Sequence, residues 1–196
     1  MDGVLIDAKE WHFDALNAAL RLFGHEISRD THLTTFDGLP TRKKLEMLTA
    51  SRGIPEGLHD LINALKQKYT MAMVQQKCTP TFNHQYAMSR LKQEGKLIGV
   101  CSNSIRRSVH TMMELARLES YIDVMFSNED VEVGKPDPEM YFAAMNALDV
   151  APGETLILED NEHGIAAAMA SGAHVMKIGV PSDVTYSAIC KKIDEI

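Results

Sequence analysis

Hydrophobic and polar positions follow two different patterns along the 196 residues of the chain. Between residues 96 and 196, short apolar runs that end in small polar or acidic residues alternate with helix-like segments; the apolar runs are KLIGVC, DVMF, TLIL and HVMKIGV. Short continuous apolar runs are typical of parallel strands that are buried on both faces. This half of the chain therefore predicts an α/β fold, a Rossmann-like doubly wound parallel sheet with helices on both of its faces.

The segment from residue 12 to residue 80 shows no clear strand pattern. Apolar residues recur at helical spacing in DAKEWHFDALNAALRLF, which Gly24 closes, and the helix-like pieces TRKKLEMLTASRG and EGLHDLINALKQKYTMAM flank a turn at RGIPEG. We therefore predict a small helical domain over residues 12–80, inserted into an α/β core that consists of residues 1–11 and 81–196.

Composition and charge indicate which kinds of molecule the protein can bind. Hydrophobic residues make up 45% of the chain and charged residues 24%, which is ordinary for a globular protein. The net charge of −7 disfavours non-specific binding to nucleic acid or to an anionic membrane. No apolar run reaches membrane-spanning length, and the three cysteines are scattered. We expect a cytoplasmic monomer or homodimer that acts on a small molecule and has no nucleic-acid or membrane partner.

Acidic side chains follow the apolar run TLIL. In open α/β sheets, ligands bind outside the carboxyl ends of the strands, so Glu159 and Asp160 are expected to face a cleft. Two adjacent carboxylates repel each other unless a cation neutralises them, and hard oxygen ligands suit Mg²⁺. The pair therefore suggests a magnesium site. The structural alternative is that Asp160 caps the following helix.

Two further strand exits carry groups that suit an anion. Ser102 and Asn103 follow KLIGVC and precede a helix, where a hydroxyl and free backbone N–H groups can bind phosphate; the alternative is an ordinary N-cap. Lys135 stands between Gly134 and Pro136, and a restrained lysine near carboxylates can balance the charge of a phosphate. The alternative for Lys135 is a solvated surface position. No glycine-rich dinucleotide motif or P-loop is present.

Taken together and in order, four stretches resemble the motifs of the haloacid dehalogenase superfamily, in its capped phosphatase and beta-phosphoglucomutase-like branch. DGVLID resembles the latter half of the first motif, CSNS the second, GKPDPE the third and LILEDNEHGIAAA the fourth. The helical insert between the first two motifs occupies the place of that family's cap. The resemblance implies a Mg²⁺-dependent phosphomonoester hydrolase that acts on a small phosphorylated metabolite, such as a sugar phosphate.

The resemblance also implies roles for single residues. Asp2 is expected to act as the acid/base and to offer its backbone carbonyl to the metal. Ser102 is expected to bind phosphoryl oxygens, and Lys135 to steady the phosphate and the nucleophile. Glu159 and Asp160 are expected to hold Mg²⁺ together with Asp2.

Three more residues are expected to bind substrate. Asn103 stands beside Ser102 in the second motif. His12, in EWHFDAL, matches a histidine that relatives place near the substrate, and Arg42, in FDGLPTRKKL, lies in a stretch that resembles the substrate-facing segment of the cap. The alternatives are a packing or surface role for His12 and a solvated position at the start of a helix for Arg42.

The sequence departs from the family pattern at its first residue. The resemblance implies that the aspartate that attacks phosphorus stands immediately before Met1, at the end of a buried central strand. The simplest explanation for the missing aspartate and strand is a start codon that was assigned too late. The chain as printed cannot follow the covalent route. Three alternatives therefore stay open: a non-catalytic relative that binds a phosphorylated ligand or a partner, a sugar phosphomutase, and an α/β domain whose acids only cap helices.

Overall fold

The computed structural model describes all 196 residues and divides the chain into two compact units. The core unit consists of Met1–Asp7 and Cys78–Ile196, and the cap unit consists of Ala8–Lys77. The boundaries expected from the sequence, at residues 12 and 80, lie a few residues further along the chain. Helical structure already begins at Lys9, because the apolar spacing of the first helix extends further back than the assigned boundary.

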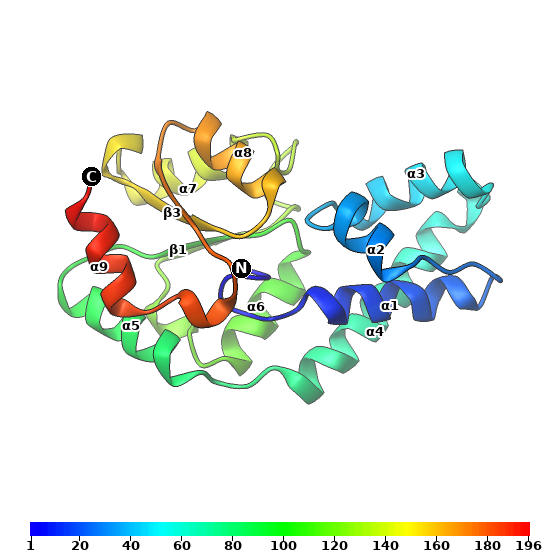
Figure 1. Cartoon of the computed structure of the whole chain (residues 1–196), viewed down its shortest axis with the longest axis horizontal. Coiled ribbons are helices and arrows are strands. Elements are labelled where there is room, and N and C mark those ends of the chain that lie inside the picture. Colours follow the sequence, from blue (N-terminus) through cyan, green and yellow to red (C-terminus); the bar gives the residue numbers. More distant parts are fainter. The chain divides into compact units, whose positions relative to one another are not determined.

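Helices dominate the chain, and the strands are short (Figure 1). The α-helices are α1 (Lys9–Arg21), α2 (Arg29–Thr31), α3 (Thr41–Arg52), α4 (His59–Lys77), α5 (Phe82–Gln93), α6 (Arg106–Leu115), α7 (Glu139–Leu148), α8 (Glu162–Ala170) and α9 (Tyr186–Asp194). The strands are β1 (Gly99–Cys101), β2 (Val124–Phe126), β3 (Leu156–Glu159) and β4 (His174–Lys177). A π-helix, η1, spans His32–Phe36, and short 3₁₀ turns are η2 (Glu56–Leu58), η3 (Glu119–Tyr121), η4 (Pro152–Glu154) and η5 (Pro181–Asp183).

The four strands of the core unit pair in parallel, as the sequence predicts. β1 pairs with β2, with Val100 opposite Met125, and β3 pairs with β4, with Ile157 opposite Val175. The two pairs form separate two-stranded sheets instead of one continuous sheet. The alternation of strand and helix therefore confirms the α/β class. No backbone hydrogen bonds join β1 to β3.

Helices cover both faces of these strands. On one face, residues of α5 and α9 pack with Leu156 and Leu158; on the other, residues of α7 and α8 pack with Cys101 and Ile157. Successive side chains of a strand point to opposite faces, so a continuous apolar run supplies both cores. Figure 1 shows α9 and α5 together on one side of the strands and α7 and α8 on the other.

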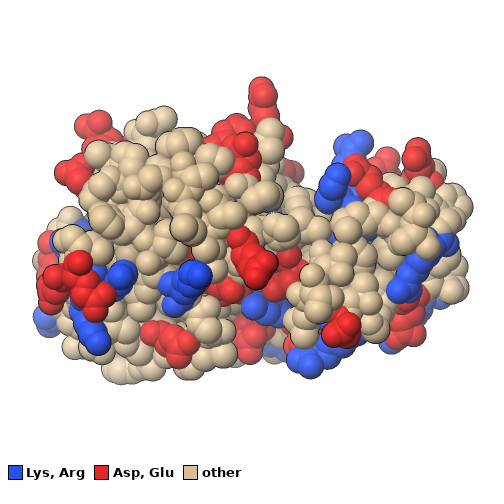
Figure 2. Space-filling view, turned by 45° about the horizontal axis from the view of Figure 1, so that its top comes forward, with Lys and Arg blue, Asp and Glu red and all other residues tan.

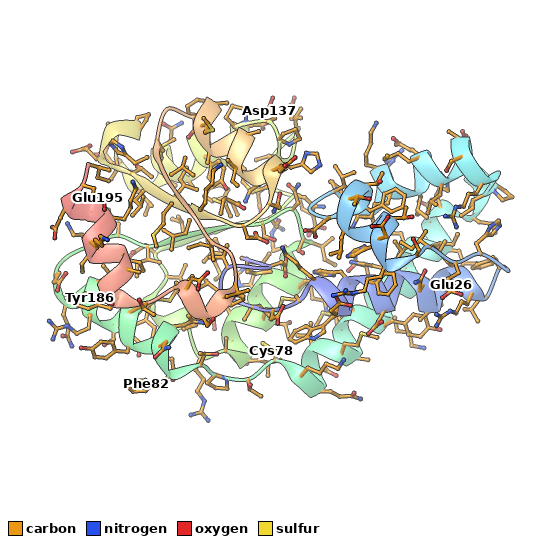
Figure 3. The ribbon with its side chains drawn as sticks, in the orientation of Figure 1. Glu26, Cys78, Phe82, Asp137, Tyr186 and Glu195 are labelled. Atoms are coloured by element: carbon orange, nitrogen blue, oxygen red, sulfur yellow. The ribbon has the colours of Figure 1, made fainter.

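The helices α5 and α9 are tied to each other at the surface of the core unit. The Tyr186 hydroxyl on α9 donates to Glu94 at the end of α5, and the Arg90 guanidinium lies 5.3 Å from the centre of the Tyr186 ring. Tyr86 of α5 also meets Tyr186 edge-on, with ring centres 6.0 Å apart. Figure 3 shows Tyr186 on α9 projecting toward α5. These contacts hold one wall of the core unit in place.

The cap unit is helical throughout, as the absence of strand patterns predicts. Its core consists of Leu16, Ala19, Leu20, Ile27, Phe36, Leu45, Leu48, Ile54 and Ile62. Buried Asn17 fixes the loop after α1, because its side-chain amide donates to Ile27 O at 3.0 Å and its side-chain oxygen accepts from Ile27 N at 2.9 Å. The polar groups of this loop are thereby satisfied inside the apolar core.

The outer surface carries charges of both signs. Figure 2 shows lysine and arginine interspersed with aspartate and glutamate on the visible face, which fits the modest negative charge of the chain. No helix combines the length and the apolar character that a membrane span requires.

Candidate active site

Asp2 is held at the carboxyl end of β1 by two serines. A tight loop positions it: Leu5 N donates to Met1 O at 2.8 Å, and Gly3 N donates to Ile6 O at 2.7 Å. The Ser104 hydroxyl lies 3.0 Å and the Ser102 hydroxyl 3.3 Å from Asp2 Oδ2, and both can donate to it. The predicted meeting of the first and second motifs is therefore present in the structure as a hydroxyl–carboxylate cluster.

Ser102 does not cap the helix that follows it. The N-cap position of α6 is Ile105, which offers no side-chain acceptor. The Ser102 hydroxyl instead accepts from Ser104 N at 3.1 Å, within the same turn. The N-cap alternative for Ser102 is therefore wrong, and its hydroxyl belongs to the cluster around Asp2.

Lys135 and Glu159 form a buried ion pair that joins the ends of two strands. Their side chains are 7% and 3% exposed, and Lys135 Nζ donates to Glu159 Oε1. The same ammonium donates to Cys101 O, the last residue of β1, at 3.1 Å, and lies 4.7 Å from the centre of the Tyr141 ring. The Tyr141 hydroxyl donates to Glu159 Oε1 at 2.5 Å. The surface alternative for Lys135 is therefore wrong.

The electrostatics of this pair follow from burial and from its partners. Burial alone would raise the pKa of Glu159, but attraction to Lys135 and to the Met1 α-ammonium, with hydrogen bonds from Lys135 and Tyr141, brings this pKa below its usual value. Burial, followed by the charge of Glu159, raises the pKa of Tyr141. Burial also raises the pKa of Cys101 to about 11. The site therefore holds a carboxylate, a neutral phenol and a neutral thiol side by side at neutral pH.

The backbone carrying Lys135 is fixed by Asn103. The Asn103 side chain accepts from Lys135 N at 3.0 Å and donates to Lys135 O at 3.0 Å. This two-point contact uses both ends of the amide, so Asn103 positions the loop of Lys135 in this structure. Its predicted contact with substrate stays a prediction.

Asp160 lies against the loop that carries Asp2. A Cβ atom placed on Gly3 would lie 1.9 Å from Asp160 Oδ2, and Gly3 has a φ of +73°, so only glycine fits there without rearrangement. The N-cap of α8 is Asn161, whose side chain accepts from Gly164 N at 2.9 Å. The helix-cap alternative for Asp160 is therefore wrong.

The three predicted magnesium ligands are Asp2, Glu159 and Asp160, and all three carry carboxylate oxygens. Carboxylate oxygens suit Mg²⁺, which needs only one or two carboxylates besides water and phosphate oxygens. Glu159 has other contacts: one oxygen meets Lys135 and Tyr141, and a Cβ on Gly164 would lie 2.2 Å from the other. Across the chain, no three His, Cys, Asp or Glu side chains are grouped as a ready metal site. The geometry of Glu159 thus differs from its predicted role as a ligand.

The two remaining predicted site residues belong to the cap unit. Half-buried His12, on α1, has its Nδ1 3.2 Å from Lys66 Nζ of α4. Arg42, in the first turn of α3, has a side chain that is 89% exposed and lies 3.8 Å from Glu46. In this structure Arg42 is therefore a solvated residue at the start of a helix, as the alternative reading predicted. Substrate binding by either residue remains a prediction.

Sequence reasoning missed three residues that the structure places in these clusters. Ser104 is the last residue of CSNS, and a count of hydroxyls in that motif would have included it. Tyr141 lies on α7, where helical periodicity marks it only as a core residue. Lys66 is buried on α4, and no local pattern distinguishes it from the exposed lysines of the same helix.

The fold defines the class: a domain of parallel strands and helices with an inserted helical unit. The profile of the family described as haloacid dehalogenase-like hydrolase matches residues 1–178, and the chain therefore belongs to this family. This confirms the family that the four motifs predicted.

Relatives of known name agree with this assignment. A phosphorylated carbohydrates phosphatase from Thermotoga maritima is 27% identical over 173 residues, which cover 88% of this chain and 79% of the relative. Pyrophosphatase PpaX from Bacillus mycoides is 28% identical over 188 residues, which cover 91% of this chain and 80% of the relative. Similarity to named phosphatases thus extends over most of the chain.

Solved structures agree on the fold. The crystal structure of beta-phosphoglucomutase from Clostridium difficile has a TM-score of 0.85 at 16% identity and covers 99% of this chain and 94% of that one. CbbY from Rhodobacter sphaeroides, solved with xylulose-(1,5)bisphosphate, has a TM-score of 0.82 at 19% identity. The match covers 90% of this chain and 82% of that one. At these identities the likeness defines the fold alone.

Proposed function

We propose that the site at the carboxyl ends of β1 and β3 binds and hydrolyses a small phosphorylated metabolite, such as a sugar phosphate. The observation that carries this proposal is the contact of Ser102 with Asp2, next to Cys101, whose carbonyl accepts from Lys135. Hydroxyl donors, a buried cation and carboxylates are the groups that phosphate-ester hydrolysis needs. Similarity to named phosphatases supports the same class of substrate.

In this proposal, each residue acts at a stated atom. Ser102 and Ser104 contact Asp2 Oδ2 and orient the carboxyl group, which gives its proton to the leaving oxygen and later takes a proton from the attacking water. The Ser102 hydroxyl exchanges its contact with Asp2 for a phosphoryl oxygen when substrate binds. Lys135, restrained by Cys101 O and Glu159, contributes a fixed positive charge beside the phosphate.

Mg²⁺ would be held by Asp2 and Asp160, and it would supply charge neutralisation for the phosphate. Glu159 is assigned to Lys135 in this proposal, because its oxygens already contact Lys135 and Tyr141. The aspartate that attacks phosphorus, which the resemblance places before Met1, is a further expectation. The residues of the printed chain contribute proton transfer, phosphate binding and charge.

The test is a phosphatase assay on the chain extended before Met1 by an apolar strand that ends in aspartate, with a panel of sugar phosphates, phosphoglycolate and pyrophosphate, with Mg²⁺ and with excess chelator. We expect phosphate release that falls at least 100-fold in Asp2→Asn, because the amide cannot take up a proton. Asp14→Asn is the matched control: it removes an exposed carboxylate on α1 and is expected to leave release unchanged. Equal rates in Asp2→Asn and the parent chain would contradict the proposal.

A second candidate is a protein that binds a phosphorylated ligand without turnover. It is favoured by the buried pairing of Glu159 with Lys135 and by the lack of any cluster of three metal-binding side chains. It predicts that inorganic phosphate binds in calorimetry, that Lys135→Met abolishes this binding, and that no product forms from any substrate. Analysis of products also separates hydrolysis from the movement of phosphate within a sugar, which is the mutase alternative.

A further inference from the structure

The outer edge of β4 faces an open groove. β4 pairs with β3 on one side, and its sheet ends there. The groove has a volume of about 470 Å³ and is lined by Met169 of α8 and by Gly172, Ala173, His174, Val175 and Lys177. We call this surface the β4 edge. The residues of β4 are half-buried or exposed, so a further strand can reach them from the groove.

The backbone of β4 directs hydrogen-bonding groups toward the groove. In a parallel ladder, the N–H and C=O of one residue point to the same neighbour, and successive residues alternate between neighbours. Ile178 N donates to Glu159 O at 2.8 Å, so the even-numbered residues of this segment face β3. Val175 and Lys177, together with Ala173 before the strand, therefore direct their backbone groups outward. Such a row of N–H and C=O groups is a template for another strand.

A second copy of the same edge matches this row. In an antiparallel pair, directly opposed residues exchange both of their backbone hydrogen bonds at alternate positions. When Val175 lies on a two-fold axis, Ala173 lies opposite the partner's Lys177, and Lys177 lies opposite the partner's Ala173. All three outward-facing residues of each copy then pair at once. The β4 edge is therefore complementary to itself, as a two-fold interface requires.

The charge of Lys177 selects the same alignment. Side chains two residues apart on a strand share a face, so Lys177 lies on the face of Val175, which packs with α8. With the axis at Val175, the two copies of Lys177 are about 13 Å apart along the strands, which exceeds a Debye length of about 8 Å. With the axis at Met176 they would be about 7 Å apart and would repel each other.

The carboxyl-terminal end of α8 complements the lysine of a second copy. The last turn of α8 holds no basic residue, and the C-terminus of a helix carries a partial negative charge that favours a cation. The chain passes from this end directly into Ala173, so the partner's Lys177 lies beside it. The same turn carries Met169, which is 66% exposed and can pack against the alkyl part of that lysine.

We propose that two copies of this chain associate through the β4 edge, with their β4 strands antiparallel about a two-fold axis at Val175. The two sheets then form one sheet in the order β3-β4-β4-β3, and Met169 of each copy packs against the partner's Lys177. The sequence leaves monomer and homodimer open, and this inference selects the homodimer. It is independent of the proposed phosphatase activity, because Asp2, Ser102 and Lys135 take no part in it.

The experiment uses the extended chain of the phosphatase assay, so that the strand expected before Met1 is present. Sedimentation velocity over a range of protein concentrations is expected to show a monomer and a dimer. Hydrogen exchange then locates the interface. The amides of Val175 and Lys177 are expected to exchange at least tenfold more slowly where the dimer predominates, whereas the amide of Met176, which faces β3, should exchange equally at all concentrations.

Charge variants test the contact with α8. Met169→Lys places a second cation beside the partner's Lys177 and is expected to weaken the dimer at least tenfold. Phe82→Lys is the matched control, because Phe82 is 75% exposed on α5, on the other face of the strands (Figure 3), and the dimer should be unchanged. Lys177→Glu should also weaken the dimer at least tenfold, because its carboxylate would meet the end of α8. Both substitutions together should restore most of the affinity, since opposite charges then face each other.

Far-ultraviolet circular dichroism checks that each variant folds. A monomer at every concentration would overturn the proposal, as would a dimer in which exchange at Val175 and Lys177 does not change. Equal weakening by Met169→Lys and Phe82→Lys, or a double variant that associates no better than either single variant, would overturn it too.

Discussion

The ion-pair cluster at the strand ends of the core unit and the His32 site of the cap unit treat their buried polar groups differently. In the core unit, Lys135, Glu159 and Tyr141 satisfy one another at the strand ends. In the cap unit, His32 is 1% exposed, and its ring meets that of Phe13 with centres 5.3 Å apart. The buried Thr70 hydroxyl has no partner.

The difference follows from the cost of burying charge. A buried ion remains charged only where a partner offsets its lost hydration, and Lys135 and Glu159 do this for each other. Asp37 favours the charged form of His32, but burial and then the charge of Lys44 outweigh it and lower the pKa of His32 to about 4, so that the ring stays neutral. The core unit thus keeps fixed charges where chemistry is proposed, and the cap unit buries a neutral ring.

The largest expected effect comes from breaking the buried pair. Lys135→Met leaves Glu159 buried without its cation, which should lower the free energy of unfolding by about 3–5 kcal/mol. Urea denaturation measures the loss. In the double variant Lys135→Met, Glu159→Gln, much of the loss should be recovered, because no uncompensated charge remains. A loss below about 1 kcal/mol in the single variant would show that the pair is not buried as described.

The next effect tests the contact between the Asp2 loop and Asp160. Gly3→Ala combines a left-handed backbone with a Cβ that would meet Asp160 Oδ2 at 1.9 Å. Gly53→Ala in the cap unit is the matched control, with a φ of +70° and no atom within 4 Å of the added Cβ. The control should cost about 1–2 kcal/mol, and Gly3→Ala at least about 1 kcal/mol more. Equal losses in urea denaturation would contradict the close approach of Asp160.

The third prediction concerns how the free energy of unfolding depends on pH through His32, the neutral buried histidine of the cap unit. The folded pKa of His32 is about 4 and the unfolded value is about 6.5, so the unfolded state takes up the proton first. The free energy of unfolding should therefore fall as the pH drops from 6.5 towards 4, by about 2 kcal/mol at pH 5, and be insensitive to His32 above pH 7. His32→Phe should remove this component of the pH dependence. An unchanged slope in that variant would refute the assignment.

The smallest effect is expected at the cap surface. Arg42→Ala removes an exposed side chain whose partner, Glu46, is 3.8 Å away on the same helix. The free energy of unfolding should change by no more than about 0.5 kcal/mol. Lys43→Ala, at the next residue of the same helix, is the control. A decrease in substrate affinity in Arg42→Ala but not in Lys43→Ala would support the predicted role of Arg42 in binding substrate.

Much of the fold was predictable because its signals are local. The apolar runs before Ser102 and Asp160 are short and unbroken, which separates buried parallel strands from the amphipathic helices of the cap unit. The rule that ligands bind at the carboxyl ends of parallel strands predicted that the strand exits at Ser102, Lys135 and Glu159 converge, and Lys135 does contact both Cys101 O and Glu159. The contacts of Glu159 were not predictable, because they depend on Tyr141 from another helix.

The sequence by itself determined the class of the fold, the helical insert and the order of the four motifs, since these depend on periodicity and on neighbouring residues. Only the tertiary structure decided what each of the two adjacent carboxylates contacts. Glu159 turns to Lys135 and Tyr141, while Asp160 lies against Gly3. It also decided that the outer edge of β4 lines an open groove. Adjacent residues of a strand point in opposite directions, and what each one meets is set by elements distant along the chain.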